Sequence, residues 1–185
     1  MRPPDPATAA FIRYSRRELD ALSGPIEAGC EHVAGCGGNS APQIILATLR
    51  TIAGYFVRMA GAMNEPTSAF WREVNEFFES QPGASPVNRE KDRNFFAKIL
   101  EAKRPSQLFD TGAMELSVLH AIGFYDRENN TAYLHRAKMF FWRFAEALVA
   151  ADLEGTLDEE AALDQFKKVL DAETDSGPDA SGRAN

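Results

Sequence analysis

The chain has 185 residues, of which 44% are hydrophobic and 25% are charged, values typical of a globular domain large enough to bury a core. Its net charge of -7 argues against a nucleic-acid or anionic-membrane partner unless a basic surface forms locally, and the sequence shows none. The first six residues lack the apolar core of a signal peptide, and no apolar run approaches the roughly 18 residues of a membrane span. We therefore expect a cytoplasmic protein that neither inserts into a membrane nor binds nucleic acid.

The N-terminal part is predicted to begin with a mobile, proline-rich lead over residues 1–6, followed by a helix over residues 7–22. Ser23-Gly24-Pro25 is predicted to end this helix, because glycine and proline both disfavour a helix interior. A short helical piece is predicted over residues 26–34, and the glycine-rich residues 35–38 then break the chain.

Two cysteines, Cys30 and Cys36, flank His32 and raise the question of a metal site. A zinc site needs four ligands, usually as paired short spacings, and the other histidines, His120 and His135, lie far along the chain in predicted helices. We therefore expect two thiols in a reducing compartment rather than a zinc site or a redox pair.

Ser40-Ala41-Pro42-Gln43 has the pattern of a helix start, with serine as the cap, proline in the first turn and glutamine three residues after the cap. The helix is predicted to run to about Met63, with Arg50 facing solvent. Thr67 is predicted to cap the next helix, which ends at Ser80. The apolar face of the first of these two helices is predicted to contain Ile44, Ile45, Thr48, Ile52, Tyr55, Phe56 and Met59.

Two more helices are predicted in the middle of the chain, over residues 87–102 and from Asp110 or Thr111 to Phe124. A polar turn is predicted over residues 126–131. Alternation at period two persists nowhere, so no strand is predicted.

Residues 125–170 are the most informative part of the sequence. Residues 132–152 are predicted to form a helix that is apolar on more than one side, because Phe140 and Trp142 lie outside the stripe of its other aromatic residues. Such a helix needs packing partners on two sides, and residues 87–124 are predicted to supply the second.

An acidic turn over residues 151–160 follows, in which Thr156 and Glu159 have the spacing of a capping box. This spacing predicts a last helix over residues 157–172. The tail over residues 173–185 contains no large apolar residue and is expected to be disordered.

These elements predict an all-α fold, a compact bundle of about seven helices in a single domain over residues 7–172. A shift of 89 positions aligns the helix pair that ends at residue 80 with the last helix pair. The aligned residues are Ile45 with Leu134, Ile52 with Phe141, Tyr55 with Phe144, Met59 with Leu148, Val74 with Leu163, and Phe77 with Phe166. A duplicated hairpin and a chance match of two amphipathic hairpins both remain open.

The acidic turn, followed by Leu163 and Phe166, resembles the acidic turn of the tellurite-resistance TerB-like family. In that family the pattern is Ala-Asp-Gly, two residues, Ser or Thr, then Glu, and the hairpin usually occurs twice in an all-helical bundle. More narrowly, residues 125–131 and 140–145 resemble the TerB-like segment found ahead of ATPase modules of the AAA class in bacteria. The resemblance implies an interaction module of the stress response.

The resemblance also implies a divalent-cation site, with calcium as the implied ion. Its candidate ligands are Asp152, Glu154, Glu159 and Glu160. The sequence departs from the family pattern, because Leu153 replaces the family's glycine and the first hairpin has Met63 and Phe70 at the acidic positions. Calcium needs six to eight oxygens, and acids at a helix start are also explained by the helix dipole.

The sequence contains no glycine-rich phosphate loop ending in Gly-Lys-Ser or Gly-Lys-Thr, no His-Glu-x-x-His and no Gly-x-Ser-x-Gly. We therefore expect a noncatalytic protein-interaction module of TerB-like type, with an AAA-type ATPase as a candidate partner. One alternative is a calcium sensor that uses the acidic turn at residues 152–160. A second is a small enzyme or a hydrophobic-ligand carrier with a cavity between the aromatic helices.

Overall fold

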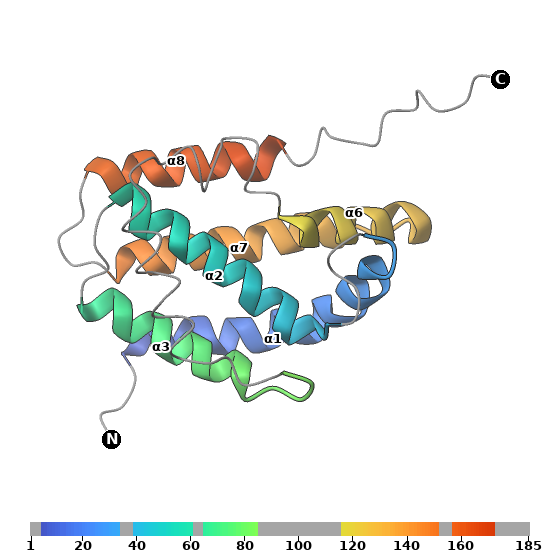
Figure 1. Ribbon diagram of the computed structural model, residues 1–185, viewed down its shortest axis with the longest axis horizontal. Helices are drawn as coiled ribbons and strands as arrows, with labels where there is room; N and C mark the ends of the chain where they lie inside the picture. The colour runs from blue at the N-terminus through green and yellow to red at the C-terminus, as the bar shows by residue number, and fades with distance from the viewer. Residues whose placement is uncertain (1–4, 34–38, 61–64, 85–115, 152–156, 173–185) are drawn as a thin grey trace.

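The computed structural model describes residues 5–33, 39–60, 65–84, 116–151 and 157–172, and within these ranges the chain is helical with no strand. The predicted all-α fold is therefore confirmed. The predicted helix over residues 87–102, the helix start at residues 110–111 and both chain ends lie outside the described residues. The described helices are α1 (Pro6–Cys30), α2 (Ala41–Ala60), α3 (Glu65–Glu79), α6 (Ser117–Asn129), α7 (Tyr133–Ala150) and α8 (Leu157–Ala172) (Figure 1).

Helices α2 and α7 form the centre of the described bundle, because each contacts every other described helix. Helix α1 lies against α2, α3, α6 and α7, whereas α8 lies at the opposite edge against α2 and α7 (Figure 1). Among the described helices, none combines the length and the apolar character needed to cross a bilayer.

Helix α1 continues through Ser23-Gly24-Pro25, so the predicted break there is wrong. Pro25 and Ile26 are buried, and their burial outweighs the local cost of a proline in a helix. The Ser23 hydroxyl donates to the Leu19 carbonyl over 2.6 Å. The C-terminal turns of α1 bend away from its first part in Figure 1, as expected for a helix that contains a proline.

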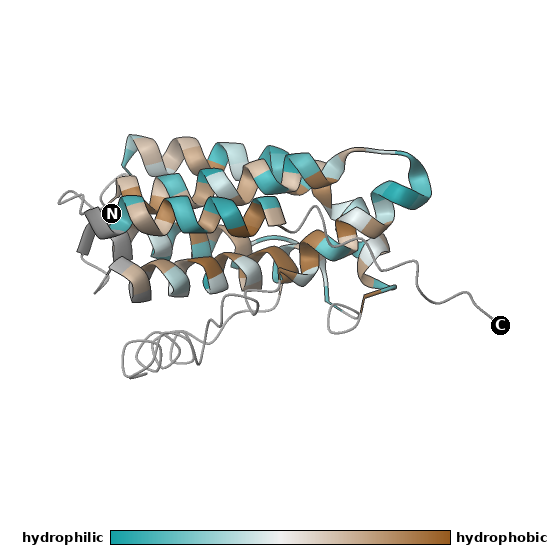
Figure 2. Ribbon diagram, turned by 90° about the horizontal axis from the view of Figure 1, so that it is seen from above, coloured by the Kyte–Doolittle hydropathy of each residue, from teal (hydrophilic) through white to brown (hydrophobic). Residues whose placement is uncertain are grey.

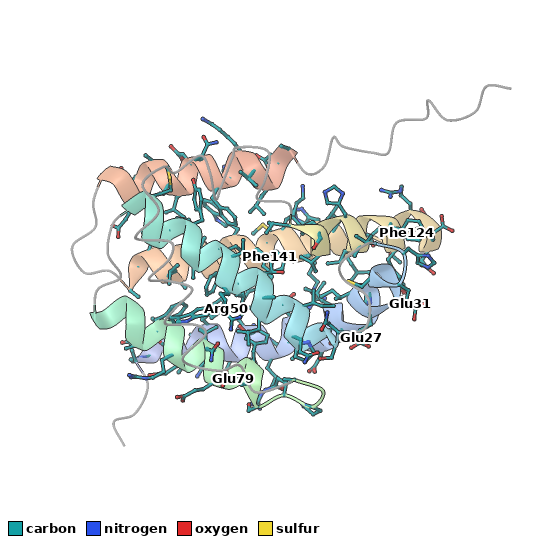
Figure 3. All side chains as sticks on the ribbon, in the orientation of Figure 1. Glu27, Glu31, Arg50, Glu79, Phe124 and Phe141 are labelled. Carbon is teal, nitrogen blue, oxygen red and sulfur yellow. The ribbon has the colours of Figure 1, made fainter. Side chains whose placement is uncertain are left out.

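The predicted start of α2 is confirmed. The Ser40 backbone N–H donates to Gln43 Oε1 over 3.1 Å, which is the reciprocal bond of a capping box. Glu27 of α1 accepts the Ala41 N–H over 3.0 Å and lies beside this helix end in Figure 3. Helix α3 begins at Glu65, so the prediction that Thr67 caps it is wrong.

Helix α6 extends to Asn129, so most of the predicted turn over residues 126–131 is helical. The helix ends at Asn130, which adopts the left-handed conformation (φ 51°, ψ 50°) that asparagine tolerates better than most residues. Asp126 then serves as a remote cap for α7, accepting the Tyr133 N–H over 2.9 Å and the Leu134 N–H over 2.7 Å. One carboxylate therefore links the two helices.

The aromatic residues of α7 are covered on two sides, as its pattern predicts, but the ring contacts come from α1, α3 and α8. Phe140 packs against Phe11 and Tyr14 of α1, with ring centroids 6.0 Å and 5.9 Å apart. Trp142 stacks on Phe166 of α8 at 6.5 Å. Helix α6 also contacts α7, while residues 87–115, the rest of the segment expected there, lie outside the described residues.

Two residues of α2 differ from their predicted environments. Met59 was expected in the apolar face but is 42% exposed, and Arg50 was expected in solvent but is only partly exposed. Elsewhere hydrophobic residues lie mainly on the sides of helices that face other helices, and the turn between α6 and α7 is hydrophilic (Figure 2). Phe141 lies in the middle of the bundle (Figure 3), and its side chain is fully buried.

Candidate functional site

Two of the four predicted metal ligands, Glu159 and Glu160, lie in the described part of the chain. Asp152 and Glu154 lie outside the described residues. Glu159 is 4% exposed in the first turn of α8, whereas the adjacent Glu160 is exposed to solvent. Neighbouring residues on a helix point in different directions, so these two carboxylates do not face the same surroundings. The cation site therefore stays a prediction.

The residues considered for a zinc site have separate environments. Cys30 is a buried thiol, and Cys36 lies outside the described residues. His32 is exposed, and its ring stacks on Phe124 with centroids 4.6 Å apart. Within the described ranges, no three histidine, cysteine, aspartate or glutamate side chains gather as a metal site would require.

The structure does bring charged residues together between α1 and α7, two helices that are far apart in sequence. Arg136 of α7 donates to Glu18 of α1 through both Nε, at 2.6 Å, and Nη2, at 3.2 Å. The Glu18 side chain is 8% exposed and the Arg136 side chain 46% exposed. The bidentate bond to Glu18 raises the pKa of Arg136 above its usual value and holds the guanidinium in one orientation.

Tyr14 lies next to this ion pair, with its ring against Phe11 and Phe140. Burial, followed by the Glu18 carboxylate, raises the pKa of Tyr14 above 10.0, and the nearby guanidinium groups of Arg143, Arg136 and Arg17 oppose this rise. Tyr14 is therefore a neutral phenol at physiological pH, and it lies near the Glu18 carboxylate and three guanidinium groups.

Arg13 lies one helical turn before Arg17 on α1 and is also exposed. We refer to Arg13, Arg17, Arg136 and Arg143 together as the arginine flank. Two of its four charges are paired within the chain, Arg136 with Glu18 and Arg143 with Glu146 at 3.1 Å. Arg13 and Arg17 form no ion pair with any described residue, so the flank carries excess positive charge.

The flank was missed from the sequence because its two halves are more than 100 residues apart. Arg13 and Arg17 are both exposed to solvent. The available signal was the spacing: four positions separate Arg13 from Arg17 and seven separate Arg136 from Arg143, and each spacing puts both residues on one helix face. Only the packing of α1 against α7 unites the two pairs.

Comparisons with protein-family models, with curated proteins and with solved structures each gave no match. The function is therefore inferred from the chemistry of the described residues. The flank offers guanidinium donors, and the Tyr14 phenol lies beside them; both kinds of group bind carboxylates or phosphates.

Proposed function

We propose that this chain is a noncatalytic protein-interaction module. The supporting observation is the segregation of charge by helix. Helix α7 has three basic residues and one acidic residue, whereas α8 has two basic and five acidic residues and α3 has one basic and four acidic residues. Charge arranged in patches of opposite sign orients partner proteins and selects among them.

The roles of several buried or helix-end carboxylates support the same proposal. Asp5 accepts the Ala7 N–H over 3.0 Å, Glu27 caps α2, Asp126 caps α7 and Glu18 anchors Arg136. Each of these acids caps the N-terminus of a helix or joins two helices. Buried aromatic rings of α7 pack on rings from neighbouring helices, which favours a structural body over a ligand carrier.

The proposal includes a bundle built from two related hairpins, α2–α3 and α7–α8. Their first helices, α2 and α7, occupy the centre of the bundle, and each second helix packs on the other hairpin's first helix. Ile52 and its aligned residue Phe141 are both fully buried. Met59 breaks the correspondence, because Leu148, with which it aligns, is buried.

The resemblance of residues 125–170 to TerB-like segments makes a bacterial AAA-type ATPase the first partner to test. The chain would be cross-linked in an extract of its host through photoreactive residues placed at Arg72 and Met139, which are exposed on different helices. Each captured protein would then be purified and titrated against the chain by calorimetry. We expect one stoichiometric complex with a Kd below about 10 µM, and reconstitution of no captured protein would contradict the proposal.

A further inference from the structure

We propose that the arginine flank is a docking surface for a short acidic segment of a partner protein, a segment rich in aspartate or glutamate. This inference rests on the proposed function and specifies both the surface and the chemistry of its partner. It follows from the positions of the four arginines, from their pairing and from the charge around them.

The positions favour a short, linear ligand. Arg136 and Arg143 are seven residues apart on α7, which places them about 10 Å apart along the helix axis. Tyr14 of α1 faces the same part of α7, because its ring lies 5.9 Å from Phe140 and both arginines act on its phenol. Carboxylates two turns apart on a helix, or three residues apart in an extended peptide, match this separation.

The ion pairs within the chain leave part of the arginine flank available to bind a partner. Glu18 holds Arg136 by two hydrogen bonds, which reduces the entropy lost when a partner's carboxylate binds the remaining guanidinium donors. Arg143 is paired with Glu146 in an exposed contact, which a carboxylate of the partner can replace at little cost. Asp20, three residues after Arg17, forms no ion pair with the flank among the described residues.

The surrounding charge limits the size of the anion. Helix α3, which contacts α1, is acidic, and the whole chain has a net charge of -7. A long polyanion such as nucleic acid, or an anionic membrane, extends beyond the flank and meets this negative charge. A segment of a few acidic residues does not, so a peptide fits the electrostatics better.

The test is the binding of fluorescein-labelled tetra-glutamate to the whole chain, followed by fluorescence anisotropy in 20 mM and 300 mM salt. Wild type is expected to bind, with an affinity at least fivefold weaker at the higher salt. The triple variant Arg13→Gln, Arg17→Gln, Arg143→Gln is expected to lose tenfold or more. Arg136 is left intact in this variant because Glu18 depends on it.

The matched control is Arg72→Gln, Lys167→Gln, Lys168→Gln, which removes the same charge from exposed positions on α3 and α8. It is expected to bind tetra-glutamate within twofold of wild type, and thermal unfolding would show that both variants fold. Equal loss in the two variants, no binding by wild type, or tighter binding of a ten-nucleotide thymidine strand or of phosphatidylserine vesicles would overturn the inference.

Failure of this inference is distinguishable from failure of the proposed function. A partner that is captured and reconstituted, and whose affinity the flank variant leaves unchanged, would support the interaction module and refute the flank as its docking surface. The absence of any reconstituted partner would refute the module itself.

Discussion

The Asp126 carboxylate shows how much of this fold depends on single polar residues at helix ends. It accepts the backbone N–H groups of Tyr133 and Leu134 and the hydroxyl of Thr131, the last over 2.6 Å. The first N–H groups of a helix have no partner within the helix, so this one side chain completes the start of α7 from the end of α6. A carboxylate at that end also interacts favourably with the helix dipole.

We expect Asp126→Ala to lower the free energy of unfolding by about 2 kcal/mol, because it leaves two backbone donors of α7 without their acceptor. Urea denaturation followed by circular dichroism would measure the change. Asp164→Asn on the exposed surface of α8 serves as the control and should change stability by less than about 0.5 kcal/mol. A loss no larger than that of the control would show that Asp126 does not support α7.

At the scale of helices, α1 and α6 approach each other closely at Gly29. A Cβ atom placed on Gly29 would lie 2.1 Å from the backbone oxygen of Ala121, far inside the van der Waals contact distance of a carbon and an oxygen. Because the obstacle is backbone, a side chain cannot rotate away to relieve it. Glycine at position 29 therefore allows α1 and α6 to pack at this distance.

Gly29→Ala should lower the free energy of unfolding by about 2 kcal/mol or more, since α1 and α6 must move apart. Gly24→Ala is the matched control on the same helix, because its added methyl group meets nothing within 4 Å. There the gain in helix propensity and the restriction before proline roughly offset, so the expected change is under about 1 kcal/mol. Thermal unfolding of both variants would make the comparison, and equal melting temperatures would contradict this account.

Helix identity was largely predictable from sequence, whereas helix boundaries were predicted only where a cap is local. The capping box of Ser40 and Gln43 is formed by neighbours in sequence, and its prediction is confirmed. The break at Pro25 was wrong because its burial against other helices is a tertiary effect. The polar residues after Tyr125 were misassigned for a related reason, since Asp126 is helical and caps the following helix.

At the scale of the whole molecule, the sequence indicated a centre rich in aromatic residues but not the neighbours of each ring. Phe11 contacts Phe70, Phe140 and Phe144, with ring centroids between 5.6 Å and 6.0 Å apart. No periodicity within one helix specifies contacts between residues so distant in the chain. The arginine flank was beyond sequence reasoning for the same reason, because it too depends on the packing of α1 against α7.

The pH dependence of stability also belongs to the whole fold, through Tyr14 and Tyr55. Burial raises the pKa of both phenols above 10.0. The folded state therefore holds these protons more tightly than the unfolded state. Their contribution is fully present below pH 10 and is lost as the pH rises above it.

We expect the urea midpoint of wild type to fall between pH 9 and pH 11, and to fall less in the double variant Tyr14→Phe, Tyr55→Phe. The variant should also be slightly less stable at pH 7, because Tyr55 donates a hydrogen bond to the Ala162 carbonyl over 3.3 Å. Denaturation curves at the three pH values test both points. An identical fall in the two proteins would assign the alkaline loss to other groups.

The position of α1 at the start of the bundle has a consequence for synthesis on the ribosome. Its buried face is completed by α7, which follows more than 100 residues later. At ordinary translation speeds, roughly ten seconds separate the emergence of the two helices. During that interval Phe11 has no α7 to cover it, so the nascent chain offers an apolar helix that chaperones recognise.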